Sequence, residues 1–161
     1  MDSSPKKKLL RFLSEDIQHG DITSALLSNQ KIKAKIISRE QGVVAGVVFA
    51  RNIFRLKRSA VRIFTKDGSR LKPNQTVLQV SGNAKSILSC ERTVLNLLSR
   101  MSGIATQTNY LVSQIKKHSK KTNLYSTRKT APGLRYFDKE AVIVGGGRKH
   151  RMALDGMIMI K

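Results

Sequence analysis

A long helical pattern in the middle of the chain constrains the fold more than any other feature. Between Ala84 and Lys117 apolar residues recur at spacings of three and four, namely Ile87, Leu88, Val94, Leu95, Leu98, Met101, Ile104, Ala105, Leu111 and Ile115. Because this spacing gathers them on one side of an α-helix, it predicts one long helix or a helix broken twice. Gly103 is the expected weak point, since glycine lowers helix stability.

Short segments rich in Val and Ile come before this helix and predict strands. The expected strands are residues 32–38, 42–48, 60–65 and 76–80. Residues 49–57 could instead form a helix, because their apolar side chains share one side. A first helix is expected to start at Pro5, capped by the serines before it, and to end near Gly20.

The segment after the long helix predicts a different architecture. An expected strand at 124–127, a helix at 134–141 and a fully apolar strand at 157–160 follow one another. This order indicates parallel βα units covered on both faces. We therefore predict the α/β class, with an α+β domain at residues 1–100 and the start of an α/β sheet or barrel at residues 101–161.

The excess of basic residues is the most unusual feature of the composition. The 161 residues include 31 Lys and Arg against 10 Asp and Glu, a formal net charge of +21. Such a charge attracts nucleic acid, anionic lipid and phosphorylated metabolites alike. The basic residues are spread along the chain, and aromatic residues make up only 5% with no Trp, which disfavours a base-stacking surface. Composition alone leaves a helix–turn–helix open.

Cysteine content and hydropathy limit which disulfides, metal sites and membrane spans the chain can form. Cys90 is the only cysteine, so an intrachain disulfide and a multi-cysteine metal site are excluded. Asp16 and Asp21 are better explained as helix caps than as metal ligands, and no metal site is predicted. The longest apolar run, from Gly42 to Ala50, is far shorter than the roughly 20 residues that span a bilayer. With no signal peptide visible, we expect a cytoplasmic protein with no membrane partner.

Five cations lie after the expected C-terminal strands or between them: Arg128, Lys129, His150, Arg151 and Lys161. The first two follow the strand at 124–127, and Lys161 follows the strand at 157–160. Because the carboxyl ends of parallel strands meet at one edge of a sheet, we expect Arg128, Lys129 and Lys161 at the same end, with His150 and Arg151 in the connection between the strands. Arginine suits carboxylates and lysine suits phosphates. The glycines at 145–147 either form a turn, which is favoured, or turn their amides toward an anion.

Six motifs, in order along the chain, resemble a single family. They are EDIQHGDITS (15–24), REQGVVAG (39–46), ERTVLNLLSRMSGIAT (91–106), TRKTAPGLR (127–135), VGGGRKHR (144–151) and IK (160–161). This series resembles quinolinate phosphoribosyltransferase, also called nicotinate-nucleotide pyrophosphorylase (carboxylating). The resemblance implies an N-terminal α/β sandwich domain, a TIM-like α/β barrel after it, and a homodimer or hexamer.

The resemblance also implies a reaction. In that family quinolinate, a pyridine dicarboxylate, receives the ribosyl group of phosphoribosyl pyrophosphate in the presence of Mg²⁺. Loss of one carboxylate as CO2 then gives nicotinate mononucleotide, a precursor of NAD.

The family's site residues fall on matching positions of this chain: Arg92, Thr127, Arg128, Lys129, His150, Arg151 and Lys161. We expect Arg128 and Arg151 to hold the quinolinate carboxylates, helped by His150. Arg92 is expected to reach this site from a neighbouring subunit. Lys129 and Lys161 are expected to act as the catalytic lysines on the phosphoribosyl side.

One departure from the family pattern concerns the C-terminus. The family continues past IK into the strands that carry the acidic residues near the ribose and metal, and these are not in this sequence. We therefore expect an inactive fragment with an incomplete barrel and no Mg²⁺ contacts of its own. The alternatives are a relative of the same fold with another anionic substrate, and a basic nucleic-acid-binding module.

Overall fold

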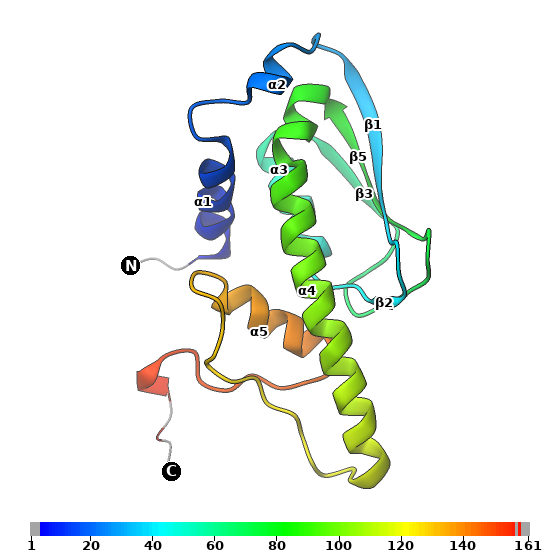
Figure 1. The fold of residues 1–161 in the computed structure, drawn as a ribbon, viewed down its shortest axis with the longest axis vertical. Coiled ribbons are helices and arrows are strands. Elements are labelled where there is room, and N and C mark those ends of the chain that lie inside the picture. Colours follow the sequence, from blue (N-terminus) through cyan, green and yellow to red (C-terminus); the bar gives the residue numbers. More distant parts are fainter. Residues whose placement is uncertain (1–3, 157, 159–161) are drawn as a thin grey trace.

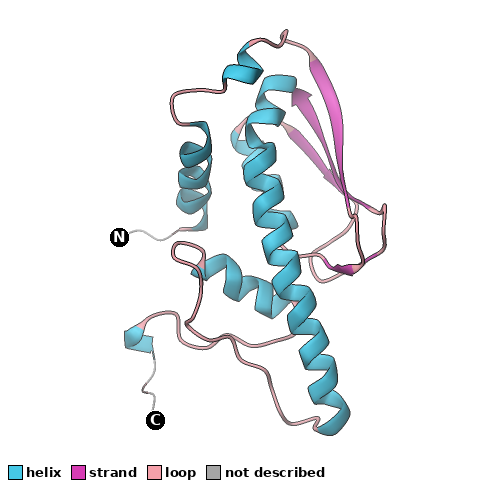
Figure 2. Ribbon diagram, in the orientation of Figure 1, coloured by secondary structure: helices cyan, strands magenta, loops and turns pink. Residues whose placement is uncertain are grey.

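The computed structural model describes residues 4–156 and residue 158. Its helices and strands, in chain order, are α1 (Pro5–Ile17), α2 (Ile22–Ala25), β1 (Lys31–Ile37), β2 (Gly42–Val43), α3 (Val47–Leu56), β3 (Ala60–Ile63), β4 (Arg70–Leu71), β5 (Thr76–Asn83), α4 (Ala84–His118) and α5 (Arg135–Val144), followed by a 3-10 turn at Leu154–Gly156. Helix α4 forms the axis of the molecule, with the sheet beside its first half and α5 beside its middle (Figure 1). Helices and strands therefore mix as the α/β prediction required (Figure 2).

Helix α4 runs for 35 residues without interruption, so of the two predicted alternatives the single long helix is correct. The Asn83 side chain caps its start by accepting a hydrogen bond from the Lys85 amide at 2.9 Å. A methyl group at Gly103 would meet nothing within 4 Å, so the glycine is exposed and unstrained. The buried side chains of Met101 and Ala105 on either side hold the helix together there, which outweighs the roughly 1 kcal/mol that glycine costs.

Strands β1, β5 and β3 form an antiparallel sheet in that order, within the described part of the chain. Ile36 pairs with Leu78, and Lys35, Gln79 and Arg62 form a row across the three strands. Along β1 the lysines are exposed and the alternate apolar residues are half-buried toward α4. The strands predicted around residues 32–38, 60–65 and 76–80 are thus confirmed.

The predicted strand at 42–48 is only partly correct. Strand β2 ends at Val43, and α3 already begins at Val47, as the alternative helix at 49–57 anticipated. Gly46 turns the chain between them with a φ of 98°, a conformation that favours glycine. The Val47 amide is then held by the Asp67 carboxylate at 2.8 Å. A continuous buried run had concealed this change from strand to helix.

The C-terminal segment is helical where the sequence predicted it, in α5, but its first strand is reduced to one contact. Tyr125 and Arg148 form a single parallel bridge in place of the expected strand at 124–127. A strand needs neighbours for its remaining hydrogen bonds, and the described residues supply only this pairing. The strand expected at 157–160 falls outside the described residues.

Four aromatic rings join the helices at the centre of the core. Phe137 of α5 contacts Phe12, Phe49 and Tyr136, with ring centroids 5.1 to 5.5 Å apart. Phe137 is fully buried, and its neighbours come from α1, α3 and α5. This cluster fixes α5 against the N-terminal elements and so positions the loops at both ends of α5.

In the described part of the chain, no helix is long and apolar enough to cross a membrane.

Cys90 is a buried residue of α4, and its environment predicts a pH effect. Its thiol faces the Ile53 carbonyl at 4.0 Å, and burial raises its pKa from 9.0 to about 11. The folded state therefore keeps the thiol proton where the unfolded chain has lost it, so this contribution is complete below pH 9 and disappears by about pH 11. We expect wild type to lose up to about 2 to 3 kcal/mol of unfolding free energy over this range relative to Cys90→Ala, measured by urea denaturation. Parallel pH profiles for the two proteins would contradict this account.

Candidate active site

Two segments far apart in the sequence lie side by side next to α5. The Ser126 amide donates to the Arg148 carbonyl at 2.9 Å, and the Arg148 amide donates to the Leu124 carbonyl at 2.8 Å. Because this pairing is parallel, the residues that follow Ser126 and those that follow Arg148 leave at the same end. The structure therefore brings together the 127–129 and 149–151 segments, whereas the strand-end argument joined Arg128 and Lys129 to Lys161 and left residues 150 and 151 in the connection.

The basic residues of these segments differ in exposure. Thr127, Arg128 and Lys129 are exposed, whereas His150 and Arg151 are half-buried. The Thr127 hydroxyl accepts a hydrogen bond from the Lys129 amide at 3.2 Å and tightens this turn. Cations at two depths suit an anionic ligand that is partly enclosed and partly open to solvent.

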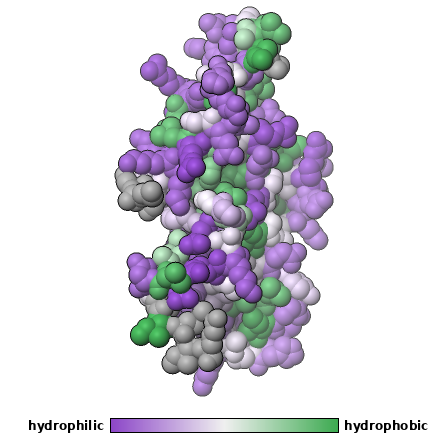
Figure 3. All heavy atoms as spheres, turned by 60° about the vertical axis from the view of Figure 1, so that its left-hand side comes forward, coloured by the Kyte–Doolittle hydropathy of each residue, from purple (hydrophilic) through white to green (hydrophobic). Residues whose placement is uncertain are grey.

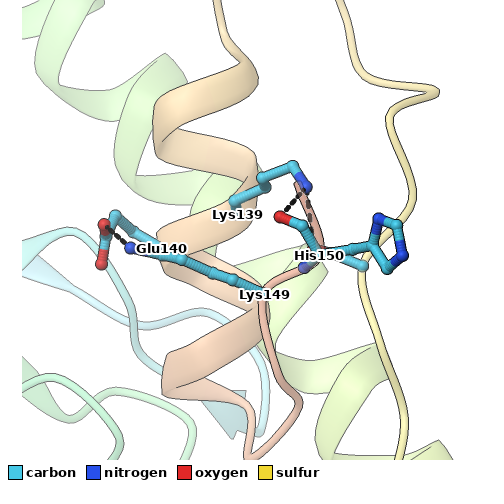
Figure 4. Close-up of polar contacts among 5 residues, drawn as sticks. Lys139, Glu140, Lys149 and His150 are labelled. Atoms are coloured by element: carbon cyan, nitrogen blue, oxygen red, sulfur yellow. Dashed lines mark hydrogen bonds and ion pairs between the residues drawn. The ribbon is translucent and has the colours of Figure 1, made fainter. Parts of the chain in front are cut away.

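Lys139 of α5 is a site residue that the sequence reasoning missed. It is 0% exposed, and its Nζ donates to the carbonyls of His150 and Arg151, each at 2.9 Å. The same Nζ lies 3.3 Å from the Ser126 hydroxyl, which also accepts from the His150 amide at 3.3 Å. In Figure 4 the Lys139 side chain reaches the main chain of His150 while the imidazole ring points away from it. Within the run RYFDKEAV the lysine resembles an ordinary solvated helix residue, so no sequence signal marked it.

The carboxylates beside Lys139 on α5 are occupied by other partners. Asp138 is buried and receives two hydrogen bonds from Arg100 of α4, at 2.8 and 2.9 Å. This pairing raises the pKa of Arg100 further above its ordinary value. Glu140 points the other way and binds Lys149 at 2.5 Å, nearer the surface (Figure 4). These two carboxylates therefore anchor α5 to its neighbours and leave the Lys139 charge unbalanced by them.

The glycines at 145–147 do not form an anion nest. Their amides donate to the carbonyls of Ala141, Ile143 and Val142 at the end of α5, at 2.9 to 3.0 Å. A methyl group on Gly145 would lie 2.5 Å from the Ala105 carbonyl oxygen, so this glycine allows α5 to approach α4 closely. The favoured turn interpretation is correct, and close helix packing is its physical reason.

Arg92, another predicted site residue, lies elsewhere. Arg92 is exposed on α4 and lines a groove of about 1140 Å³ beside the inner face of the sheet. None of the residues 127–129, 150 or 151 lines this groove, so Arg92 is not part of the cluster above. Lys161 lies outside the described residues. Its expected role, like that of Arg92, stays a prediction.

No group of three or more acidic, His or Cys side chains able to hold a metal ion occurs among the residues that the structure describes. Asp21 accepts hydrogen bonds from the Ser24 amide at 2.9 Å and from the Ser24 hydroxyl, as the capping interpretation predicted.

Hydrophilic residues cover most of the face drawn in Figure 3, with separate apolar patches between them. The polar surface is thus broad on this face, and hydropathy alone does not locate the site.

Comparison with known proteins decides the family. The family described as quinolinate phosphoribosyl transferase, N-terminal domain, matches residues 21–102, and the corresponding C-terminal domain matches residues 104–161. The chain belongs to the quinolinate phosphoribosyltransferase family. Family membership extends over both the sheet-bearing half and the cationic segments.

Relatives of this chain within the quinolinate phosphoribosyltransferase family agree with one another in name and in fold. Probable nicotinate-nucleotide pyrophosphorylases (carboxylating) of Archaeoglobus fulgidus and Methanothermobacter thermautotrophicus are 40% and 41% identical over 89% and 91% of this chain, which covers 55% and 53% of them. The solved nicotinate-nucleotide pyrophosphorylase of Francisella tularensis superposes with a TM-score of 0.85 at 37% identity, over 94% of this chain and 56% of that one. The chain thus spans about half the length of the relatives it matches, and its mixed α/β fold is theirs.

Proposed function

We propose that the protein transfers the phosphoribosyl group of phosphoribosyl pyrophosphate to quinolinate and releases CO2, giving nicotinate mononucleotide and pyrophosphate. The observation that carries the proposal is the parallel pairing that places the 127–129 and 149–151 segments at one end, in a chain of this family. Relatives about 40% identical carry the name of this activity. Both substrates are polyanions, so a cationic cluster supplies the charge that their desolvation requires.

The roles of the site residues follow from their chemistry. We assign Arg128 and Arg151 to the two carboxylates, since a guanidinium binds a carboxylate through two parallel hydrogen bonds. His150 supports them, and Lys129 and Lys161 face the phosphoribosyl and pyrophosphate groups as point charges. When the pyridine nitrogen bonds to the ribose carbon, the bond to pyrophosphate breaks and pyrophosphate takes the electron pair. Cations beside that oxygen stabilise the developing charge.

Mg²⁺ is expected with the family, but the described site residues do not fit it. The side chains gathered here are cations, whereas Mg²⁺ prefers oxygen ligands. We therefore assign the ion to the pyrophosphate group of the substrate, whose charge it would neutralise, and not to ligands among the described residues. We also propose that residues 101–161 form the first part of a TIM-like barrel after an N-terminal sandwich domain at 1–100.

We also propose that a neighbouring subunit contributes Arg92 to the site. Arg92 is exposed and lies in the groove away from the cation cluster. In a homodimer or hexamer, that position allows it to approach the carboxylate site of another copy. The same-fold alternative with a different anionic substrate has no specific observation in its favour, nor has a nucleic-acid-binding module.

Binding of pyridine carboxylates by the complete gene product tests the proposal. We expect isothermal titration to show quinolinate binding at least about tenfold more tightly than nicotinate, because the second carboxylate gains a charged hydrogen-bonding partner. Duplex and single-stranded DNA at moderate salt serve as controls for the nucleic-acid alternative. Equal affinity for quinolinate and nicotinate, or DNA binding tighter than either, would refute the assignment.

A further inference from the structure

Lys139 is an unusual ionisable group, because it is fully buried and its hydrogen-bond partners among the described residues are all neutral. Lysine is almost never fully buried unless its charge is paired. Here the ammonium has three N–H donors and three acceptors, the carbonyls of His150 and Arg151 and the Ser126 hydroxyl. The hydrogen bonds satisfy its donors but do not neutralise its charge.

The charge around Lys139 is positive on balance. The adjacent carboxylates, Asp138 and Glu140, are bound to Arg100 and Lys149. Burial lowers the pKa of Lys139, and the positive charges of Arg135 and Lys149 lower it further. A buried cation with no anionic partner costs free energy, and a ligand carrying two negative charges nearby would offset this cost.

The acceptors of Lys139 show how it acts. Two of them are main-chain carbonyls of His150 and Arg151, whose side chains we assign to the carboxylates. The third, the Ser126 hydroxyl, directly precedes the 127–129 segment and also accepts from the His150 amide. One ammonium therefore ties together both segments that carry the proposed ligand-binding cations.

We propose that Lys139 is a positioning residue for quinolinate, which holds the main chain of His150 and Arg151 in place and adds a buried positive charge beneath the dicarboxylate. This inference rests on the proposed function for its ligand. The fixing of residues 150 and 151 by Lys139 does not depend on the proposed function. Lys139 contacts no substrate in this account and acts through the two residues that do.

The test compares two lysines that each donate to two main-chain carbonyls, in the complete gene product. Lys139→Met removes the buried ammonium, and the control Lys116→Met removes an exposed ammonium that donates to the Lys120 and Thr122 carbonyls. We expect Lys139→Met to raise the KM for quinolinate about 10- to 100-fold, from the loss of hydrogen bonds to a charged group. The KM for phosphoribosyl pyrophosphate and all constants of the control should stay within about threefold. A defect of folding alone would not separate the two substrates in this way.

Amide hydrogen exchange provides the second arm. Exchange at residues 150 and 151 should rise at least about tenfold in Lys139→Met and not in Lys116→Met, because opening of this segment costs less without the buried ammonium. If Lys139→Met does not fold, Ser126→Ala carries the same comparison with an effect of about 3- to 10-fold. Wild-type binding with unchanged quinolinate KM in the folded variant would overturn the inference and leave the proposed function intact. If wild type binds no quinolinate, the proposed function fails. Unchanged exchange would then overturn the positioning role, and raised exchange would retain it for another anion.

Discussion

Replacement of Arg128 or Arg151 by alanine is expected to weaken quinolinate binding by about 30-fold to several thousand-fold. The physical reason is that truncating one partner of a partly desolvated charge pair costs about 2 to 5 kcal/mol, since it also leaves the other charge without a partner. Arg151 is half-buried and should lie at the upper part of this range, whereas Arg128 is exposed and should lie at the lower part. Isothermal titration at constant ionic strength measures both.

The control for this prediction is Arg55→Ala. Arg55 is exposed near the end of α3, so the substitution lowers the net charge equally without touching the site. We expect its quinolinate affinity to stay within about threefold of wild type, because surface charges at this distance are screened. Unchanged affinity in both Arg128→Ala and Arg151→Ala would remove these residues from the carboxylate site. Equal losses in all three proteins would indicate a general effect of charge.

Phe137→Ala is expected to produce the largest loss of stability, about 3 to 5 kcal/mol. The ring is fully buried and contacts three other aromatic rings, so its removal leaves a cavity where α1, α3 and α5 meet. Because Lys139 lies two residues after Phe137 on the same helix, we expect quinolinate affinity to fall as well, even in protein that is still folded. Urea denaturation followed by circular dichroism measures the first effect.

Phe64→Ala is the matched control for the core substitution. Its ring is 48% exposed, and the Arg62 guanidinium lies over it, 4.9 Å from the ring centroid. We expect a loss of about 1 kcal/mol or less. A similar loss in both variants would show that the aromatic cluster does not organise the core.

Local patterns predicted the elements whose formation depends on local spacing. Helices α1, α4 and α5 were visible in the sequence because one apolar face repeats along each of them. The change from β2 to α3 was ambiguous, since the run GVVAGVVFA is apolar throughout and fits either a strand or a helix, and the Gly46 turn separates the two elements. The strand at 124–127 depends on neighbours that periodicity does not reveal.

The candidate site, like the fold, could be predicted from the sequence only in part. The structure pairs the 127–129 and 149–151 segments, because the parallel bridge fixes which ends meet. The strand-end argument had instead joined Arg128 and Lys129 to Lys161, which lies outside the described residues, and had left residues 150 and 151 in the connection between the strands. It missed Lys139, because a lysine between Asp138 and Glu140 on a short helix looks solvated until packing buries it. The helix-end role of the glycines at 145–147 likewise depends on how closely α5 approaches α4.

The most direct test of the central claim is the reaction itself. The complete gene product is incubated with phosphoribosyl pyrophosphate, Mg²⁺ and quinolinate labelled in its 2-carboxylate, and labelled CO2 and nicotinate mononucleotide are measured together. We predict equal amounts of the two products, dependence on phosphoribosyl pyrophosphate, and strong loss of both in Arg151→Ala. Folded wild-type protein that binds quinolinate but releases no CO2, or that forms a nucleotide from another pyridine instead, would contradict the account.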